Sequence, residues 1–441
     1  MIRRNLIATI ALFALSAGVA LQAQPSVCDS LSEPPRRPLT LLNDAASGMH
    51  LLKDLPPSAV DLANGNRRLL LELDAAGFFF DAEYDSPCAS GYSVTGFRLS
   101  PTLVYGINHK AQLRVGFNAM AFAGLDSLYM KRPSLSLLYS PTPWLQLVAG
   151  TLFGGYFHET GMPVYDPSRW IYHYQEDGLQ ILTQTDFWKS DTWLDWHHYL
   201  TPGTPDQEQF TMGSRHELRL LKIETAHGAA VQPCWAYPLG TPPPDTGTCQ
   251  PHSGFEVLLP MHFTANHRGG QVNTVNAGSP TVFNESAALH MRYRRTGSNR
   301  HNTHEINASV PVYFYQCNMT PPDRNGYGLL PSLGYSFSHV NTRQGSAWLL
   351  HATAGRWHGE HYFNTLGSPL FFSPAAAAVH TTGIANPTDE THDAWYFRAA
   401  IEHEFKGLDL GLQVDCTSDS QSSNSFIFSF YMRFKERFLL F

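Results

Sequence analysis

The sequence has few charged side chains. Asp, Glu, Lys and Arg make up 15% of the 441 residues, whereas soluble domains contain about 25%. Hydrophobic residues nevertheless reach only 43%, with aromatics at 12%. A membrane wall built from strands produces this combination, because only alternate residues of each strand face lipid.

Long apolar runs are missing after residue 24, which excludes transmembrane helices from that part of the chain. The first residues differ. Arg3 and Arg4 precede an apolar run from Leu6 to Leu21, and the small residue Ala23 follows. This is the layout of a secretory signal, so we expect an exported chain.

The expected domain organisation has three parts. A signal peptide occupies residues 1–23. Residues 24–66 are rich in Pro and Ser and show no strand pattern, so they form a periplasmic extension or a plug segment. Alternating segments fill residues 67–441 and predict a single barrel.

Several chemical motifs are also absent. No CxxC, HExxH or GxSxG occurs, so zinc knuckles, zincin-type metal sites and the common serine-hydrolase elbow have no support. The net charge of −7 argues against a nucleic-acid partner. We therefore predict no catalytic residue, no metal, no cofactor and no enzyme activity. Of the six cysteines, Cys234 and Cys249 flank a Pro/Gly loop and are the candidate disulfide.

Alternation of apolar and polar residues is what the sequence does contain. In residues 393–416, Trp395, Phe397 and Ile401 share one face, and Arg398 and Glu402 share the other. Comparable segments predict sixteen strands, beginning near residues 67, 92, 110, 131, 143, 174, 189, 209, 253, 284, 303, 327, 346, 393, 408 and 424. An even number suits bacterial barrels, whose two chain ends lie on the periplasmic side.

Connections between the predicted strands alternate in length. If the first strand runs outward, most outer connections are long and most inner ones short, with residues 223–252 as the exception. The outer segment 359–392 is too apolar for a freely solvated loop, which favours a loop folded into the barrel. Segment 155–173 is the second candidate for such a loop.

The last strand points to a family. Residues 424–441 place Phe at alternate positions, and Phe434, Phe438 and Phe441 lie near or at the end. Together with the signal peptide and the alternating strands, this resembles the outer-membrane β-barrel proteins of Gram-negative bacteria, in particular uncharacterised ones of porin size. The resemblance implies that these three aromatics are the signal for the barrel-assembly machinery, and that the protein lies in the outer membrane.

The predicted fold class is therefore all-β: a transmembrane antiparallel β-barrel of about 16 strands, within 14–18. Because a barrel of that size leaves an aqueous interior, we expect a porin-like channel for passive diffusion of small hydrophilic solutes. The polar strand faces supply the candidate lumen-lining residues: Arg98, Arg114, Glu256, His262, Arg292, Arg294, Arg398, Glu402, Glu404, Asp409 and Asp415.

Two alternatives stay open. One is a barrel enzyme of the lipid-hydrolase or protease type, and the other is a surface receptor or adhesin that uses the long outer loops. The expected partners are outer-membrane lipid, the barrel-assembly machinery and small solutes. The sequence does not decide whether the protein forms a homo-oligomer.

Overall fold

The computed structural model describes residues 69–440, apart from 86–88, 143, 167, 186, 202–206, 225–252, 270–278, 298–301, 319–324, 342–345, 375, 377–390, 406–407 and 420–423. The predicted signal peptide, the 24–66 segment, the Cys234–Cys249 pair and Phe441 lie outside the described residues. Within them, Cys416 is a free thiol, and Cys317 is buried at the end of the strand that it closes. No helix in the described part of the chain is long and apolar enough to cross a membrane.

Strands make up nearly all of the described structure. They are β1 (Leu69–Glu83), β2 (Tyr92–Asn108), β3 (Ala111–Phe122), β4 (Met130–Thr142), β5 (Leu145–Thr151), β6 (Asp177–Gln184), β7 (Trp188–His198), β8 (Gln209–Glu224), β9 (Gly254–Arg268), β10 (Thr281–Thr296), β11 (Asn302–Cys317), β12 (Gly326–Leu329), β13 (Ser332–Asn341), β14 (Ser346–Glu360), β15 (Thr391–Phe405), β16 (Leu408–Asp419) and β17 (Asn424–Leu439). Three short helical turns lie between them: η2 (Gly155–His158), α3 (Arg169–Tyr172) and η4 (Pro369–Phe371).

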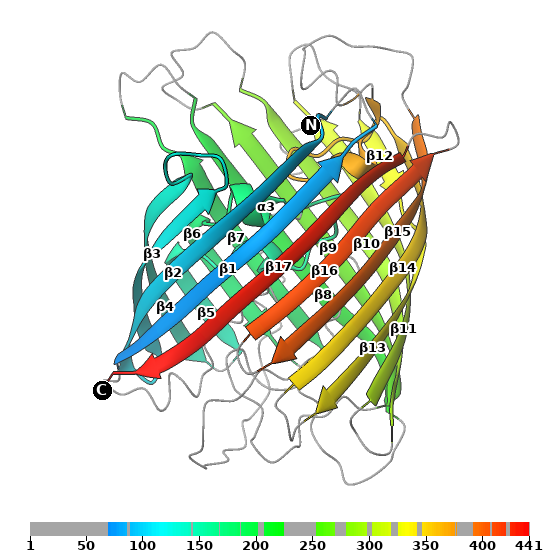
Figure 1. Cartoon of the computed structure of the whole chain (residues 1–441). Coiled ribbons are helices and arrows are strands. Elements are labelled where there is room, and N and C mark those ends of the chain that lie inside the picture. Colours follow the sequence, from blue (N-terminus) through cyan, green and yellow to red (C-terminus); the bar gives the residue numbers. More distant parts are fainter. Residues whose placement is uncertain are drawn as a thin grey trace. The chain divides into compact units, whose positions relative to one another are not determined.

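The strands close into a ring. Apart from β12 and β13, each pairs antiparallel with its neighbours in sequence, and β1 pairs with both β2 and β17 (Figure 1). β12 and β13 both pair with β11 and β14, so they are two halves of one wall strand. The break falls at Pro331, which has no N–H to donate to the ladder. Sixteen wall positions result, and the predicted antiparallel barrel of sixteen strands is confirmed, with every strand beginning within three residues of its predicted start.

The two faces of the wall follow the alternation seen in the sequence. In β17, Phe430 and Met432 are 42% and 47% exposed on the outer face, whereas Tyr431 and Arg433 are buried on the inner face. The strand continues without a register shift until Leu439 pairs with Leu70. Closing the ring leaves no sheet edge, as hydrocarbon surroundings require.

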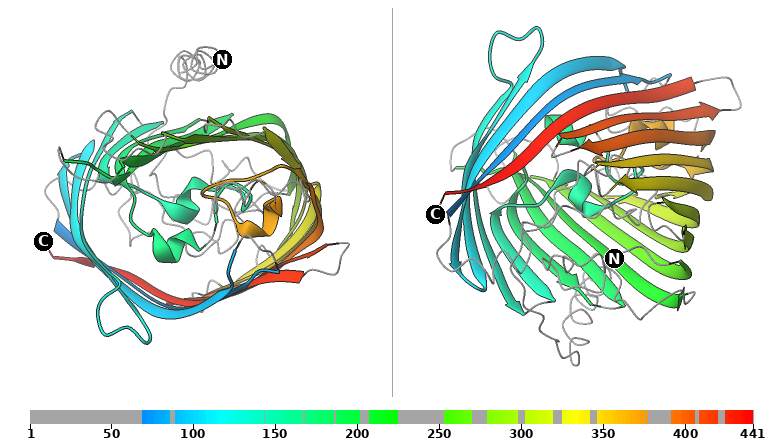
Figure 2. Two further views of the ribbon diagram at one scale, coloured as in Figure 1. Left: turned by 90° about the horizontal axis from the view of Figure 1, so that it is seen from above. Right: turned by 60° about the horizontal axis from the view of Figure 1, so that its bottom comes forward.

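The interior of the barrel contains chain. Seen along the axis, the helical turns η2, α3 and η4 lie within the ring of strands (Figure 2). They belong to residues 152–176, which connect β5 and β6, and to residues 361–376, the first part of the connection between β14 and β15. Both leave the wall at the end opposite to the start of β1 and the end of β17. We call these two segments, described except for residues 167 and 375, the plug.

Candidate functional site

The two plug segments bind each other through backbone groups. The amide of Asp166 donates to the carbonyl of Leu366 at 2.6 Å, and that of Ser368 donates to the carbonyl of Met162 at 2.9 Å. The Tyr362 hydroxyl donates to the carbonyl of Pro163 at 2.9 Å. Because these bonds join segments about 200 positions apart in sequence, the plug is a packed unit inside the barrel.

Aromatic side chains attach the plug to the inner wall. Trp170 of the plug lies edge-on to Phe78 of β1, with ring centroids 5.4 Å apart. On the other side, Trp357 of β14 packs against Phe371 at 5.1 Å and against Tyr362 at 5.3 Å. These inward aromatics are buried. They form an apolar core at a place where an open pore would present polar side chains to water.

All of the predicted lumen-lining residues lie on inward-facing sides of the wall: Arg98, Arg114, Glu256, His262, Arg292, Arg294, Arg398, Glu402, Glu404, Asp409 and Asp415. Many carry an ion pair. Arg98 contacts Asp74 at 3.2 Å, and the ring of Tyr174 covers its guanidinium at 3.7 Å. Arg398 contacts Asp415 at 2.6 Å, with both side chains buried. Whether these groups border a conducting path stays a prediction, but opposite charges neutralise each other in close pairs.

His158 is the most enclosed ionisable group of the plug. Its Nδ1 lies 2.7 Å from Asp191 of β7, and its Nε2 lies 2.8 Å from Glu176. Its ring stacks at 3.6 Å on Trp193, which lies over Gly213, where a Cβ atom would come within 2.1 Å of the indole. Burial alone would lower the pKa of His158, but the two carboxylates outweigh it and raise the pKa to about 10.

The role of His158 follows from this geometry. Both ring nitrogens are occupied by carboxylates and the imidazole is charged at neutral pH, so it is unsuited to act as a general base. It instead neutralises two buried acids and joins the plug to β7. The same cluster explains why the pKa of Glu176 is held below its usual range, although burial opposes this.

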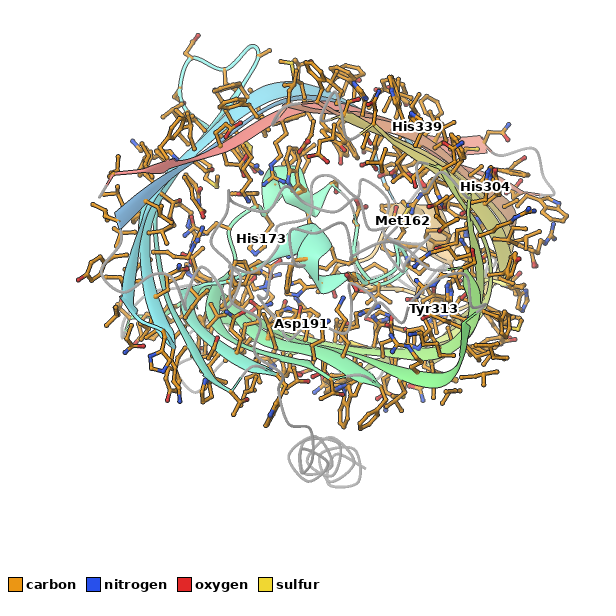
Figure 3. The ribbon with its side chains drawn as sticks, turned by 90° about the horizontal axis from the view of Figure 1, so that it is seen from below. Met162, His173, Asp191, His304, Tyr313 and His339 are labelled. Carbon is orange, nitrogen blue, oxygen red and sulfur yellow. The ribbon has the colours of Figure 1, made fainter. Side chains whose placement is uncertain are left out.

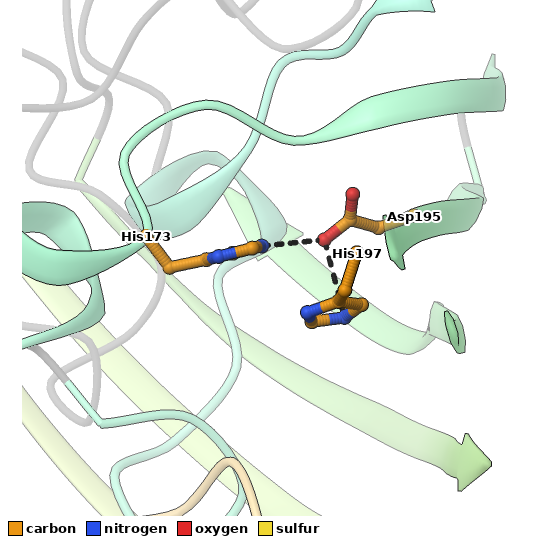
Figure 4. Close-up of side chains that lie close together, drawn as sticks. All are labelled: His173, Asp195 and His197. Atoms are coloured by element: carbon orange, nitrogen blue, oxygen red, sulfur yellow. Dashed lines mark hydrogen bonds and ion pairs between the residues drawn. The ribbon is translucent and has the colours of Figure 1, made fainter. Parts of the chain in front are cut away.

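A second histidine cluster lies at the C-terminal end of β7 (Figure 4). His173 follows helix α3 in the plug, and its Nε2 is 2.8 Å from Oδ2 of Asp195. Nε2 of His197, on the same strand as Asp195, is 3.4 Å from that oxygen. Figure 3 shows His173 and Met162 inside the ring of strands. His173 and His197 remain partly exposed.

The outer wall carries a third group of interacting side chains. Thr183, Ser190, Thr192, Ser214 and His216 face outward on β6, β7 and β8, and we call them the outward polar island. Leu179 and Ile181, on the same face of β6, are 58% and 37% exposed, as lipid-facing residues are. On these three strands the island interrupts a mostly apolar outer face, which includes Leu194, Phe210 and Met212. Polar groups facing hydrocarbon require partners within the protein.

The pair at the centre of the island is Ser214 and His216. Oγ of Ser214 lies 2.6 Å from Nε2 of His216, and Oγ1 of Thr192 lies 3.3 Å from the Ser214 oxygen. Trp188 meets the imidazole edge-on, with ring centroids 5.7 Å apart. Nε1 of Trp188 and Nδ1 of His216 are buried without a hydrogen-bond partner among the described residues.

A serine–histidine pair also lies on the inner wall. Oγ of Ser336 is 2.7 Å from Nδ1 of His351, and Oγ1 of Thr353 is 2.7 Å from Nε2 of the same ring. All three side chains are buried, as Ser214 and His216 are, so burial does not distinguish the two pairs. Since hydroxyl groups occupy both nitrogens, this imidazole has no free position for a further partner. The inner pair therefore resembles the outer one in distance, but not in surroundings.

Sequence reasoning missed both serine–histidine pairs. The outer pair had a visible signal: in residues 210–218, Phe210, Met212 and Leu218 share the outer face with Ser214 and His216, so polar groups interrupt an apolar face. The proximity of Asp195 and His197 was indicated only by their spacing, because residues two apart on a strand share a face. No local pattern indicated the approach of His173, which comes from a different segment.

Comparison with solved structures finds barrels of similar extent at low identity. A loop L8 deletion mutant of OmpT from Vibrio cholerae is 10% identical and has a TM-score of 0.43, with 83% of this chain and 99% of that chain covered. OmpF of Salmonella typhi in complex with daunomycin is 10% identical and has a TM-score of 0.43, with 85% of this chain and 99% of that chain covered. OpdL of Pseudomonas aeruginosa is 11% identical and has a TM-score of 0.40, with 84% of this chain and 99% of that chain covered. No curated protein matches the sequence. The fold assignment rests on the strand pairing itself.

A family model matches most of the chain. Its description is lipid A 3'-O-deacylase-type, and the match covers residues 60–235 and 245–441. The prediction from sequence that the protein is not an enzyme is therefore wrong, because the matched family is named for a hydrolytic activity. That prediction rested on missing motifs such as GxSxG, which belong to other hydrolase folds. The match spans nearly the whole barrel, and the protein belongs to the lipid A 3'-O-deacylase-type family.

Proposed function

We propose that the protein hydrolyses an acyl ester bond of a membrane lipid at its outer wall, with Ser214 as nucleophile and His216 as general base. The observation that carries this proposal is the hydrogen bond of 2.6 Å between the two side chains, which point to the lipid side of the wall and are 7% and 8% exposed. An acylated lipid meets the barrel from that side. Membership of a deacylase-type family supports the same class of reaction.

The pair can perform ester hydrolysis in two stages. As Oγ of Ser214 attacks the carbonyl carbon, its proton passes to Nε2 of His216. The ester C–O bond then breaks, and His216 returns the proton to the leaving oxygen, which departs as an alcohol. Water attacks the acyl-serine and loses a proton to His216. The acyl–Oγ bond then breaks, the fatty acid leaves, and His216 returns the proton to Oγ of Ser214.

Ester hydrolysis also needs a donor for the carbonyl oxygen and a contact that orients the histidine, and neighbouring side chains provide both. In the attack, negative charge develops on the ester carbonyl oxygen, which needs a hydrogen-bond donor. Nε1 of Trp188 is a buried donor without a partner among the described residues, and its ring contacts His216. We assign it this role. Since Nδ1 of His216 also has no partner there, packing against Trp188 orients the imidazole in place of a carboxylate.

The inner serine–histidine pair provides a matched control for the experiment. The folded protein in detergent micelles is given an acylated outer-membrane lipid, and released fatty acid is measured by mass spectrometry. S214A and H216A are expected to lower the rate by about 10³-fold. S336A and H351A, which alter the pair facing the lumen, are expected to hydrolyse at the wild-type rate.

Two results would contradict the proposal. Full activity of folded S214A with loss in S336A would move the reaction to the lumen. The enzymatic proposal for this site is also contradicted if the folded wild-type protein hydrolyses neither acylated lipids nor simple fatty-acid esters. Migration of the unheated protein on a gel, compared with heated protein, shows whether each variant is folded.

Passive diffusion of small solutes is the second candidate function. It is favoured by the sixteen wall positions, since barrels of that size enclose an interior wide enough for water. The plug and the paired charges of the inner wall oppose it. Single-channel current across a planar bilayer decides: steady conductance steps from wild-type protein support a channel. Silence from folded protein that hydrolyses lipid supports the esterase alone.

A further inference from the structure

We propose that His173, Asp195 and His197 form a binding site for a divalent transition-metal ion of the zinc type, which links the plug to the barrel wall. One ligand atom from each residue lies within 4.8 Å of the others (Figure 4). The three residues come from two elements, because His173 belongs to the plug whereas Asp195 and His197 lie on β7.

The distances suit a small ion. In a tetrahedral site with metal–ligand bonds of 2.0–2.1 Å, two ligand atoms are separated by roughly 3.3 Å. The 3.4 Å between Nε2 of His197 and Oδ2 of Asp195 already has this value. The 2.8 Å between Nε2 of His173 and the same oxygen is a hydrogen bond. It needs to lengthen by about half an ångström, which a side-chain rotation of His173 in the plug supplies.

The donor set selects the class of metal. Two imidazoles and one carboxylate favour zinc, cobalt, nickel or copper, whereas calcium and magnesium prefer oxygen ligands throughout. The rings of His173 and His197 are stacked with centroids 4.5 Å apart, and Nε2 of each ring lies close to Oδ2 of Asp195. Three protein ligands leave a fourth position for water.

Surrounding groups hold the carboxylate in place. Oδ1 of Asp195 accepts the backbone N–H of Asp177 at 2.9 Å, which leaves Oδ2 directed at the histidines. A backbone partner of this kind orients metal ligands in known sites. The hydroxyl of Thr211 is 2.7 Å from Nε2 of His197, so this hydrogen bond is exchanged for the metal–nitrogen bond when an ion binds. Asp195 is itself buried, while both histidines keep a path to water.

The consequence of metal binding is a cross-link. His173 follows helix α3, so an ion shared with β7 would fix this part of the plug against the wall. The inference does not depend on the proposed esterase, because Asp195 and His197 face the interior, whereas Ser214 faces outward. Failure of one proposal would leave the other intact.

Cobalt titration tests the site on the folded full-length protein after removal of metals with a chelator. We expect one equivalent of Co²⁺ to bind, with visible absorption bands from coordinated nitrogen, and Zn²⁺ to displace it. H173Q and H197Q each remove a ligand. We expect them to weaken Co²⁺ binding by more than the roughly 10–100-fold that loss of an outer-shell partner causes.

A second histidine–aspartate pair gives the matched control. His358 of β14 is 2.9 Å from Asp393. Among the described residues, no third His, Cys, Asp or Glu side chain lies close enough to this pair to complete a metal site. H358Q is expected to bind Co²⁺ as the wild type does. The proposal is overturned if the folded wild-type protein binds no stoichiometric Co²⁺ or Zn²⁺, or if H173Q and H197Q bind as tightly as H358Q.

Discussion

The barrel wall carries two serine–histidine pairs of nearly equal length on opposite faces. Ser214 and His216 are 2.6 Å apart on the lipid side, and Ser336 and His351 are 2.7 Å apart on the lumen side. The inner ring is held by hydroxyls at both nitrogens, whereas the outer ring has one nitrogen and a neighbouring indole N–H without partners among the described residues. The same two residue types therefore serve different purposes according to what surrounds them.

The largest expected difference between the two pairs is in chemical reactivity. An alkyl fluorophosphonate modifies serines that an adjacent base activates. We expect Ser214 to be labelled and Ser336 to stay unmodified, with labelling in H216A slower by about 10³-fold. Mass spectrometry of proteolytic peptides locates the adduct. An adduct on Ser336, or equal rates in H216A and wild type, would reverse the assignment of the two pairs.

Tryptophans on the two faces offer a comparison of packing. Trp357 is fully buried between the plug and the inner wall, whereas Trp395 is 52% exposed on the outer face. W357A should reduce the free energy of unfolding by about 3–5 kcal/mol, because it opens a cavity between packed rings. W395A should cost about 1 kcal/mol or less. Denaturant unfolding followed by gel mobility measures both, and equal losses would mean that the plug does not contribute to stability.

The pH dependence of stability tests the plug contact at His158. Its folded pKa is raised to about 10, against about 6.5 in an unfolded chain. Its stabilising contribution is therefore complete below pH 6.5 and is lost as the pH rises toward 10. We expect a loss of about 1.5–3 kcal/mol, the usual value of hydrogen bonds to a charged group. Unfolding midpoints between pH 6 and 10.5 measure it, and a profile for H158Q as steep as that of the wild type would contradict it.

Much of the wall was predictable because one physical rule governs it. Alternate residues point to opposite faces, so Phe430 and Arg433 reveal their faces without any tertiary information. The strands that contain Trp193 and Trp357 alternate poorly between apolar and polar residues, for a reason that only the structure shows. There the inner face packs against the plug, and inward positions are apolar as well. Segment 359–392 was expected to fold inward from its apolar residues. Its two ends belong to β14 and β15, and residues 361–376, described except for 375, lie within the barrel (Figure 2).

The candidate sites were less accessible to sequence reasoning. The outward island joins residues of β6, β7 and β8, and its polar side chains become noticeable only when neighbouring strands are placed in register. His173 meets Asp195 because the plug returns into the barrel, and Glu176 and Asp191 meet at His158 for the same reason. No spacing rule connects residues from a loop and a wall strand.

By itself, the sequence determined the class of this protein: strand periodicity, strand number, and which side chains face lipid or the interior, since these depend on local geometry. Only the tertiary structure decided what the interior contains and where chemistry can occur. Whether a lumen is open or filled depends on how long loops pack, and whether a serine is activated depends on side chains that strand pairing places beside it. Loop packing and serine activation both depend on contacts between residues far apart in sequence. The free energy of these contacts is distributed over the closed barrel.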